Sequence, residues 1–171
     1  VVAVRRPRLV VVDEVAAGRG GHLADGVGVG VEVRGLVLRR RLDCPTPRVR
    51  AGQAIAAVAH ACIDVSDGLL GDLAKLCAAS GVGADVASRE LPLSAGLCSV
   101  AAPEARIAWA LGGGDDYELL FTADPAERAR VAALDAGVVL RRIGTVTEAG
   151  SVLVDGVPPG RDAGHGFDHF G

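Results

Sequence analysis

A strand-to-helix junction near residue 66 constrains the fold of this chain more than any other feature. Residues 61–66 form a short, mainly apolar segment with β-branched side chains, which is typical of a buried strand. From residue 68 to residue 80, apolar side chains recur at helical spacing and form one stripe, made of Leu69, Leu70, Leu73, Leu76 and Cys77. Gly81 then follows as a typical C-cap. The junction predicts a helix whose apolar stripe packs on the core.

Strands and helices alternate through the rest of the chain after residue 44. Further helices are predicted at 49–59, 103–111 and 125–134, and further strands at 83–88, 117–122, 138–146 and 151–154. Residues 147–150 are predicted to join the last two strands as a hairpin turn. The alternation predicts an α/β (α+β) fold, a two-layer domain with a mixed sheet and helices on one face.

The first 43 residues are rich in Val, Arg and Gly. Two strands are possible there, at 8–13 and 27–33, although glycine at every second position weakens the second one. The two prolines of CPTPR, residues 44–48, indicate a linker. We therefore expect a poorly matching N-terminal remnant at 1–43 and a domain at 44–171. Because the chain begins with Val1 and contains no Met, we also expect it to be a fragment.

The composition makes some classes of partner unattractive. The net charge is −3, with 18 basic and 21 acidic residues, so no large positive field favours nucleic acid or an anionic membrane. No apolar run approaches the roughly 18 residues of a membrane span. The four cysteines show no metal-like spacing and are expected to be free thiols. We expect a cytoplasmic protein without nucleic-acid or membrane partners.

Polar side chains interrupt the apolar pattern at the strand-to-helix junction. Asp64 and Ser66 are two residues apart, so a strand would place them on one side, facing one cleft. Ser66 and Asp67 lie where the helix begins, and the simplest interpretation of them is helix capping. Capping does not explain Asp64, whose charge in an apolar strand needs a cation or an exposed edge. Clustered carboxylates beside a helix N-terminus suit Mg²⁺ and a phosphate.

A second acidic segment, GGGDDYE, occupies residues 112–118. It reads as a flexible loop leading into a strand, in which Glu118 shares a face with Leu120 and points away from Tyr117. The structural alternative places Glu118 in water on an exposed edge strand. For Asp115 and Asp116 the alternative is turn chemistry, with the side chains bonded to their own backbone.

The segments IDVSDGLL (63–70) and GGDDYELLF (113–121), with the ending GFDHF (166–170), resemble thiamine-monophosphate kinases. That family belongs to the superfamily of aminoimidazole-ribonucleotide synthetase, whose C-terminal domain the predicted fold resembles. The resemblance implies ATP- and Mg²⁺-dependent phosphorylation of thiamine monophosphate to thiamine diphosphate. It implies Mg²⁺ at Asp64 and Asp67, ATP at Ser66, and the thiamine moiety at Glu118 and Phe167. Phe170 is an alternative to Phe167, because it fits the same chemical description. It also implies a homodimer for the full-length protein.

The resemblance covers about 110 residues and leaves out the N-terminal domain that supplies most metal and ATP contacts in that family. Residues 1–43 do not resemble the end of that N-terminal domain, and a frameshifted translation would explain them. We therefore expect this chain to be inactive alone. Two alternatives remain: another member of the superfamily, such as a selenophosphate synthetase or a hydrogenase-maturation protein, or a non-catalytic α/β binding or dimerisation module. Two histidines in the tail, His165 and His169, are expected to be solvated rather than metal ligands.

Overall fold

The computed structural model describes residues 8–12, 38–148 and 150–160, and for 8–12 it describes the backbone alone. A helical segment at 38–43 comes before α2. The labelled elements follow in the order β1 (Arg8–Val12), α2 (Val49–Ile55), β2 (Ala59–Val65), α3 (Leu69–Ser80), β3 (Gly83–Val86), the 3-10 turn η1 (Ser88–Glu90), α4 (Ala95–Val100), α5 (Pro103–Gly112), β4 (Glu118–Ala123), the 3-10 turn η2 (Pro125–Glu127), α6 (Arg128–Ala132), β5 (Leu140–Thr147) and β6 (Val152–Val154).

The strands form one mixed sheet in the order β2-β4-β1-β5-β3-β6. Neighbours are antiparallel except β3 and β6, which are parallel. The predicted hairpin at 147–150 is wrong, because β3 lies between β5 and β6 and pairs with both. A short polar connection indicates a turn, but it does not exclude a third strand between the two that it joins.

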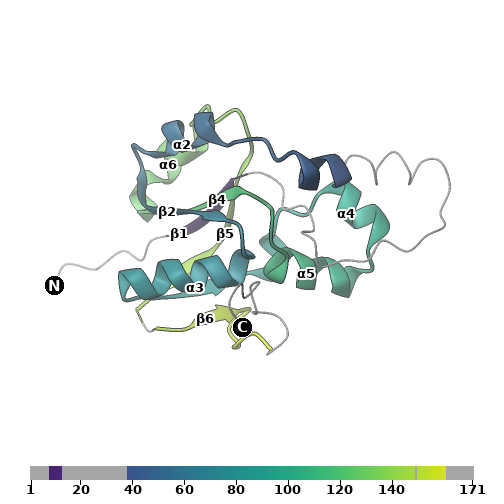
Figure 1. Ribbon diagram of the computed structural model, residues 1–171. Coiled ribbons are helices and arrows are strands. Elements are labelled where there is room, and N and C mark those ends of the chain that lie inside the picture. Colours follow the sequence, from purple (N-terminus) through teal and green to yellow (C-terminus); the bar gives the residue numbers. More distant parts are fainter. Residues whose placement is uncertain (1–7, 13–37, 149, 161–171) are drawn as a thin grey trace.

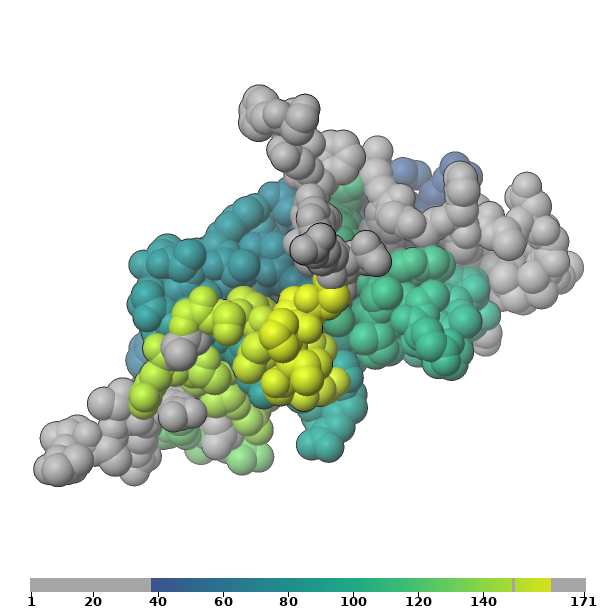
Figure 2. Space-filling view, turned by 90° about the horizontal axis from the view of Figure 1, so that it is seen from below, coloured from purple at the N-terminus to yellow at the C-terminus, as the bar shows by residue number. Residues whose placement is uncertain are grey.

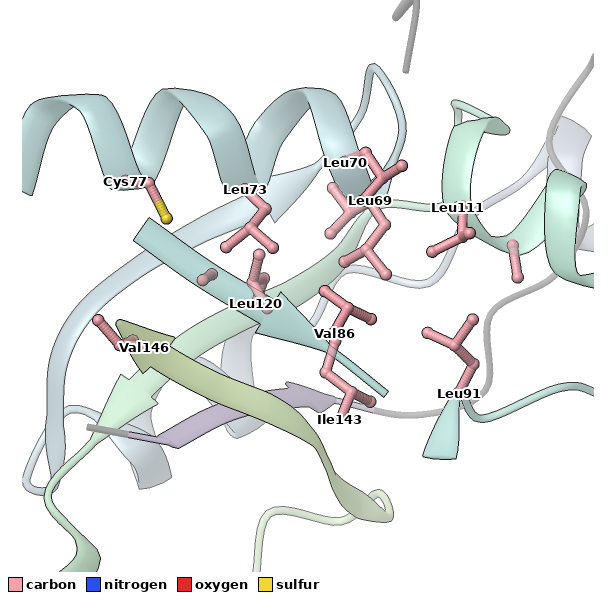
Figure 3. Packing of buried hydrophobic residues seen from close by; sticks show 13 residues of the cluster. Leu69, Leu70, Leu73, Cys77, Val86, Leu91, Leu111, Leu120, Ile143 and Val146 are labelled. Carbon is pink, nitrogen blue, oxygen red and sulfur yellow. The ribbon is translucent and has the colours of Figure 1, made fainter. Parts of the chain in front are cut away.

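The junction at the start of α3 folds as the sequence predicts. The buried side of α3 consists of Leu69, Leu70, Leu73 and Cys77, together with Asp72. Gly81 ends the helix in the left-handed region at φ 66, and its N–H bonds to the carbonyl oxygens of Cys77 and Ala78. Figure 3 shows the stripe pointing at Leu120 of β4, Val86 of β3 and Val146 of β5. The apolar stripe of the helix and the sheet therefore build the larger core.

A smaller core lies on the opposite face of the sheet. Leu120 belongs to the larger core and Phe121 to the smaller one, since neighbouring strand residues point to opposite faces. The smaller core joins Phe121 to Ile55 and Ala51 of α2 and to Val131 of α6. Figure 1 shows α2 and α6 together on one side of the strands and α3 on the other. The mixed sheet and α/β class are confirmed, and the short helices add a partial layer on the second face.

The last described strand, β6, packs beside α3. In Figure 2 the yellow-green segment around β6 lies against the teal helix α3, and the two elements contact each other. At the other edge of the sheet, β2 has one strand neighbour among the described residues, β4. No helix in the part of the chain that the structure describes is long and apolar enough to cross a membrane.

Candidate functional site

Two loops meet where the neighbouring strands β2 and β4 come together. Val65 at the end of β2 pairs with Glu118 at the start of β4, because the two strands are antiparallel. The loop after β2 is therefore held beside the loop before β4. The amide of Asp115 donates to the carbonyl of Ser66 at 2.8 Å, and the amide of Tyr117 donates to that of Val65 at 2.7 Å. The structure brings together the two motifs that the sequence singled out.

Glycine is required for this close contact. A Cβ added at Gly68 would lie 2.8 Å from the carbonyl oxygen of Gly112, and one added at Gly114 would lie 2.7 Å from that of Ser66. Gly68 also has a φ of 110°, which residues with a side chain rarely adopt. The glycines of both motifs thus let one backbone lie directly on the other.

The loop before β4 carries backbone strain. Asp115 has φ 65° and Tyr117 has φ 52°, two left-handed residues that are not glycine within three positions. Such conformations cost about 1–3 kcal/mol each and concentrate at functional sites. The side chain of Asp116, between them, is 5% exposed. The loop is therefore held in one shape rather than being a mobile glycine linker.

Asp72 shapes the loop after β2, and the sequence analysis missed it. Its Oδ2 accepts the backbone N–H groups of Ser66 and Asp67, both at 2.9 Å, and its side chain is 2% exposed. The N-cap of α3 is Gly68, without a side-chain capping bond. The prediction that Ser66 and Asp67 cap the helix is wrong, because the carboxylate of α3 binds their amides instead. A lone Asp within an apolar helix stripe was the available signal.

Lys75 adds a positive charge to this network. Its Nζ donates to Oδ1 of Asp72 at 2.9 Å and to Oδ2 of Asp67 at 2.5 Å. The hydrogen bond to Asp67, and next the one to Asp72, raise the pKa of Lys75 above its usual range. The side chains of Lys75 and Asp67 are 56% and 30% exposed, so solvent reaches this ion pair, whereas the Asp72 side chain is buried.

Asp64 lies on the edge strand β2 with its side chain exposed. Of the two explanations given for it, a cation or an exposed edge, the edge is present. The strand ends at Val65, so strand alternation does not extend to Ser66, and the predicted common face is not formed by the strand. Burial, and then the charge of Asp64, raise the pKa of the nearby Cys62 thiol.

Glu118 is buried rather than solvated. Its side chain is 1% exposed, so the alternative that placed it in water on an exposed edge is wrong. Arg48 binds both carboxylate oxygens, Nε to Oε2 at 2.8 Å and Nη2 to Oε1 at 2.7 Å, and Arg41 binds Oε1 as well. Glu118 thereby ties β4 to the segment at 38–48.

The fit to a metal ion is partial. Among the described residues, no group of three or more His, Cys, Asp or Glu side chains is close enough to hold one. Mg²⁺ is commonly bound by one or two protein carboxylates together with phosphates and water, and Asp67 and Asp64 match that smaller demand. The predicted residue Phe167 and the tail histidines lie outside the described residues, as does the strand considered at 27–33.

Two cavities lined by described residues lie away from these motifs. One of about 460 Å³ lies between α6 and β5 and is lined by Val131, Leu134 and Leu140 among others. One of about 550 Å³ lies along β3 and β5 and includes Arg128 and Arg141. The strained, glycine-dependent loops are therefore preferred to these cavities as the candidate site.

The model of the family described as AIR synthase related protein, C-terminal domain, matches residues 23–156. The chain belongs to this family. The match begins before residue 44, and β1 lies within the sheet, between β4 and β5. The division at 43/44 therefore stays a prediction, with both observations favouring continuity across it.

Relatives of this family member are named thiamine-monophosphate kinases. That of Escherichia coli (strain K12) is 40% identical over 139 residues, which are 78% of this chain and 42% of the relative. The crystal structure of thiamine-monophosphate kinase from Stenotrophomonas maltophilia K279a has a TM-score of 0.79 at 35% identity, covering 91% of this chain and 52% of that one. The structure described as AaThiL complexed with AMPPCP and TMP has a TM-score of 0.78 at 31% identity, covering 98% and 52%. The chain thus spans less than half the length of the curated relative.

Proposed function

We propose that this chain is the C-terminal part of a thiamine-monophosphate kinase, which transfers the γ-phosphoryl group of ATP to thiamine monophosphate with Mg²⁺ and forms thiamine diphosphate. The observation that carries the proposal is the contact between the loops at 66–68 and 112–117 in a chain whose relatives bear that name. The AaThiL structure with AMPPCP and TMP supports a nucleotide and a phosphorylated second ligand.

The proposed roles follow from charge and position. Asp67 and Asp64 would hold Mg²⁺, and Ser66 would contact ATP. When bound, Mg²⁺ neutralises phosphate charge and orients the transferred group. The residues of this chain contribute positioning: Asp72 fixes the amides of Ser66 and Asp67, and the carbonyl of Ser66 holds Asp115. Phosphoryl transfer depends mainly on such positioning and on charge stabilisation.

The substrate contact predicted for Glu118 stays a proposal, and its burial weighs against it. A cationic substrate would have to compete with Arg41 and Arg48 for the same carboxylate. Asp115 is a further candidate, because its strained backbone is held against Ser66 at the meeting of the two loops. Phe167 would pack on the substrate rings. By the same resemblance, we propose a cytoplasmic homodimer for the full-length protein.

Ligand-dependent melting tests the proposal. A ligand that binds only the folded state stabilises it by RT ln(1 + [L]/Kd), so Tm rises with the logarithm of the ligand concentration above Kd. We expect thiamine monophosphate with a non-hydrolysable ATP analogue and Mg²⁺ to raise Tm, and selenide or carbamoyl phosphate to leave it unchanged. A response to selenide or carbamoyl phosphate alone would point to another member of the superfamily.

A non-catalytic module is the second candidate, favoured by the exposed edge strand β2. In that case Asp64→Asn and Asp67→Asn would bind the ligands as the wild-type chain does. The kinase proposal requires both variants to lose the Mg²⁺-dependent part of the Tm shift, measured for each variant against its own Tm in the absence of ligand.

A further inference from the structure

Lys75 stands out within the Asp67–Asp72 network because it is the chain's only lysine among 18 basic residues. It extends from α3, one turn after Asp72, and its Nζ bridges the two carboxylates at 2.9 and 2.5 Å. The two bonds differ in their surroundings: Asp72 is 2% exposed, whereas Asp67 is 30% exposed. Lys75 is thus anchored on a buried carboxylate and reaches out to a solvent-accessible one.

The anchoring carboxylate is fully used by protein groups. Oδ2 of Asp72 accepts the amides of Ser66 and Asp67, and Oδ1 accepts Lys75. Removing Asp72 from this position would leave two half-buried amides without this acceptor, which is costly. The carboxylate of Asp67 is partly exposed, so water or a metal ion can take the place of the Lys75 ammonium group there. The bond between Lys75 and Asp67 is therefore the more accessible part of the network.

We propose that the ammonium group of Lys75 binds Asp67 until a divalent metal ion displaces it. This competition lowers the affinity of Asp67 for the metal. The inference rests on the proposed function in one respect, namely that Asp67 is a metal ligand. Displaced from Asp67, Lys75 keeps its bond to Asp72 and stays near the site. Its charge then opposes the metal at short range.

The rate at which the Lys75 amine is acylated reports the displacement directly. Because Lys75 is the only lysine, one peptide carries the modified lysine side chain. The two hydrogen bonds of Lys75 restrain its amine, so this amine should react with an acylating reagent several-fold more slowly than the side-chain amine of Nα-acetyl-lysine amide added as reference. Saturating Mg²⁺ should raise the rate towards that of the reference, as followed by mass spectrometry, while NaCl at equal ionic strength should not. A Tm increase by Mg²⁺ without a change of rate would overturn the inference and leave the proposed function intact.

Metal affinity gives the second measurement. Exposed ion pairs contribute about 0.2–1 kcal/mol, so Lys75→Met should tighten Mn²⁺ binding, followed by electron paramagnetic resonance, by about 1.5- to 5-fold. Lys75→Arg keeps the charge and should bind as the wild type. Arg130→Met is the matched control, since it removes a positive charge bonded to Glu127 in the same (i, i+3) relation but on another helix. It should change nothing.

The remaining outcomes separate the two ideas. Weaker Mn²⁺ binding by Lys75→Met at unchanged Tm would make Lys75 a support of the site and overturn the inference. If Asp67→Asn binds Mn²⁺ as well as the wild type does, Asp67 is no ligand, and both the inference and that part of the proposed function fail.

Discussion

At the scale of single residues, Glu118 was predicted from its motif to contact substrate, but in the structure it forms ion pairs within the protein. Three guanidinium nitrogens from Arg41 and Arg48 bind its carboxylate, and these residues come from a segment about 70 positions earlier. The charge is compensated by protein, so its first effect is on the folded state. Any contact with substrate would need this cluster to open.

Glu118→Gln should therefore destabilise the chain. Removing one partner of a buried ion pair typically costs about 3–5 kcal/mol, and this variant removes the carboxylate charge that Arg41 and Arg48 share. Urea unfolding followed by circular dichroism measures the loss. Glu127→Gln, which breaks the exposed pair with Arg130, is the control and should cost less than about 1 kcal/mol. Equal midpoints for the two variants would show that the buried cluster contributes no more than a surface pair.

Gly68 is the residue at which the contact between the two loops can be tested. Gly68→Ala adds a Cβ at φ 110°, 2.8 Å from a backbone oxygen that cannot move without shifting α5. We expect a loss of about 1–3 kcal/mol in the free energy of unfolding. Gly160→Ala, where nothing lies within 4 Å of the new Cβ, should stay within about 0.5 kcal/mol of wild type. A Gly68→Ala variant as stable as Gly160→Ala would mean that the loops do not lie this close.

At the scale of elements, β6 depends on a polar connection to the rest of the sheet. Asp155, just after β6, accepts the amide of Ser88 at 3.0 Å and its hydroxyl at 2.6 Å, both from η1. The hydrogen bond from the Ser88 hydroxyl, and next that from its amide, lower the pKa of Asp155 below its usual 3.8. This holds β6 beside β3, since the amide of Asp155 also donates to the carbonyl of Val86.

The lowered pKa of Asp155 predicts the direction of a pH effect. The folded state binds this proton less readily than the unfolded state, so the stabilisation is present above pH 3.8 and is lost as the pH falls through the folded-state pKa. Between pH 6 and pH 3 the Tm of wild type should fall more steeply than that of Asp155→Asn. Asn suits the variant, because it tolerates the φ of 51° at this position. Parallel curves would rule out a contribution from this carboxylate.

At the scale of the whole molecule, the described part of the chain lacks some of the groups that the proposed phosphoryl transfer would need. It contains no group of three or more potential metal-binding side chains, and the chain covers 42% of its Escherichia coli relative. Phosphoryl transfer needs both reactants held in line with their charge neutralised. The two loops can position only some of these groups.

We therefore expect the 171-residue chain alone to form no detectable thiamine diphosphate from thiamine monophosphate, ATP and Mg²⁺. Chromatography of the products, with the Escherichia coli relative assayed in parallel, measures this. Turnover by the chain alone would show that its own residues suffice. It would also mean that the catalytic site is complete within these 171 residues.

Local pattern was enough to predict most elements and to single out the two motifs of the candidate site. The strand and helix on either side of residue 66, the stripe of α3 and the Gly81 cap were all predicted, because side-chain periodicity and left-handed glycine act over a few residues. The motifs of residues 63–70 and 113–121 were likewise visible as sequence. Their contact was not, because it depends on β2 pairing with β4 across more than fifty residues.

The sequence by itself determined the alternating elements, the faces of α3 and β4, and the glycine-rich acidic segments. Only the tertiary structure decided that β3 separates β5 from β6, that Asp72 binds the amides of Ser66 and Asp67, and that Glu118 is buried between Arg41 and Arg48. The physical reason is range. Periodicity and capping are settled within a turn or two, whereas strand order and the partner of a buried charge are settled by which distant segments share one core.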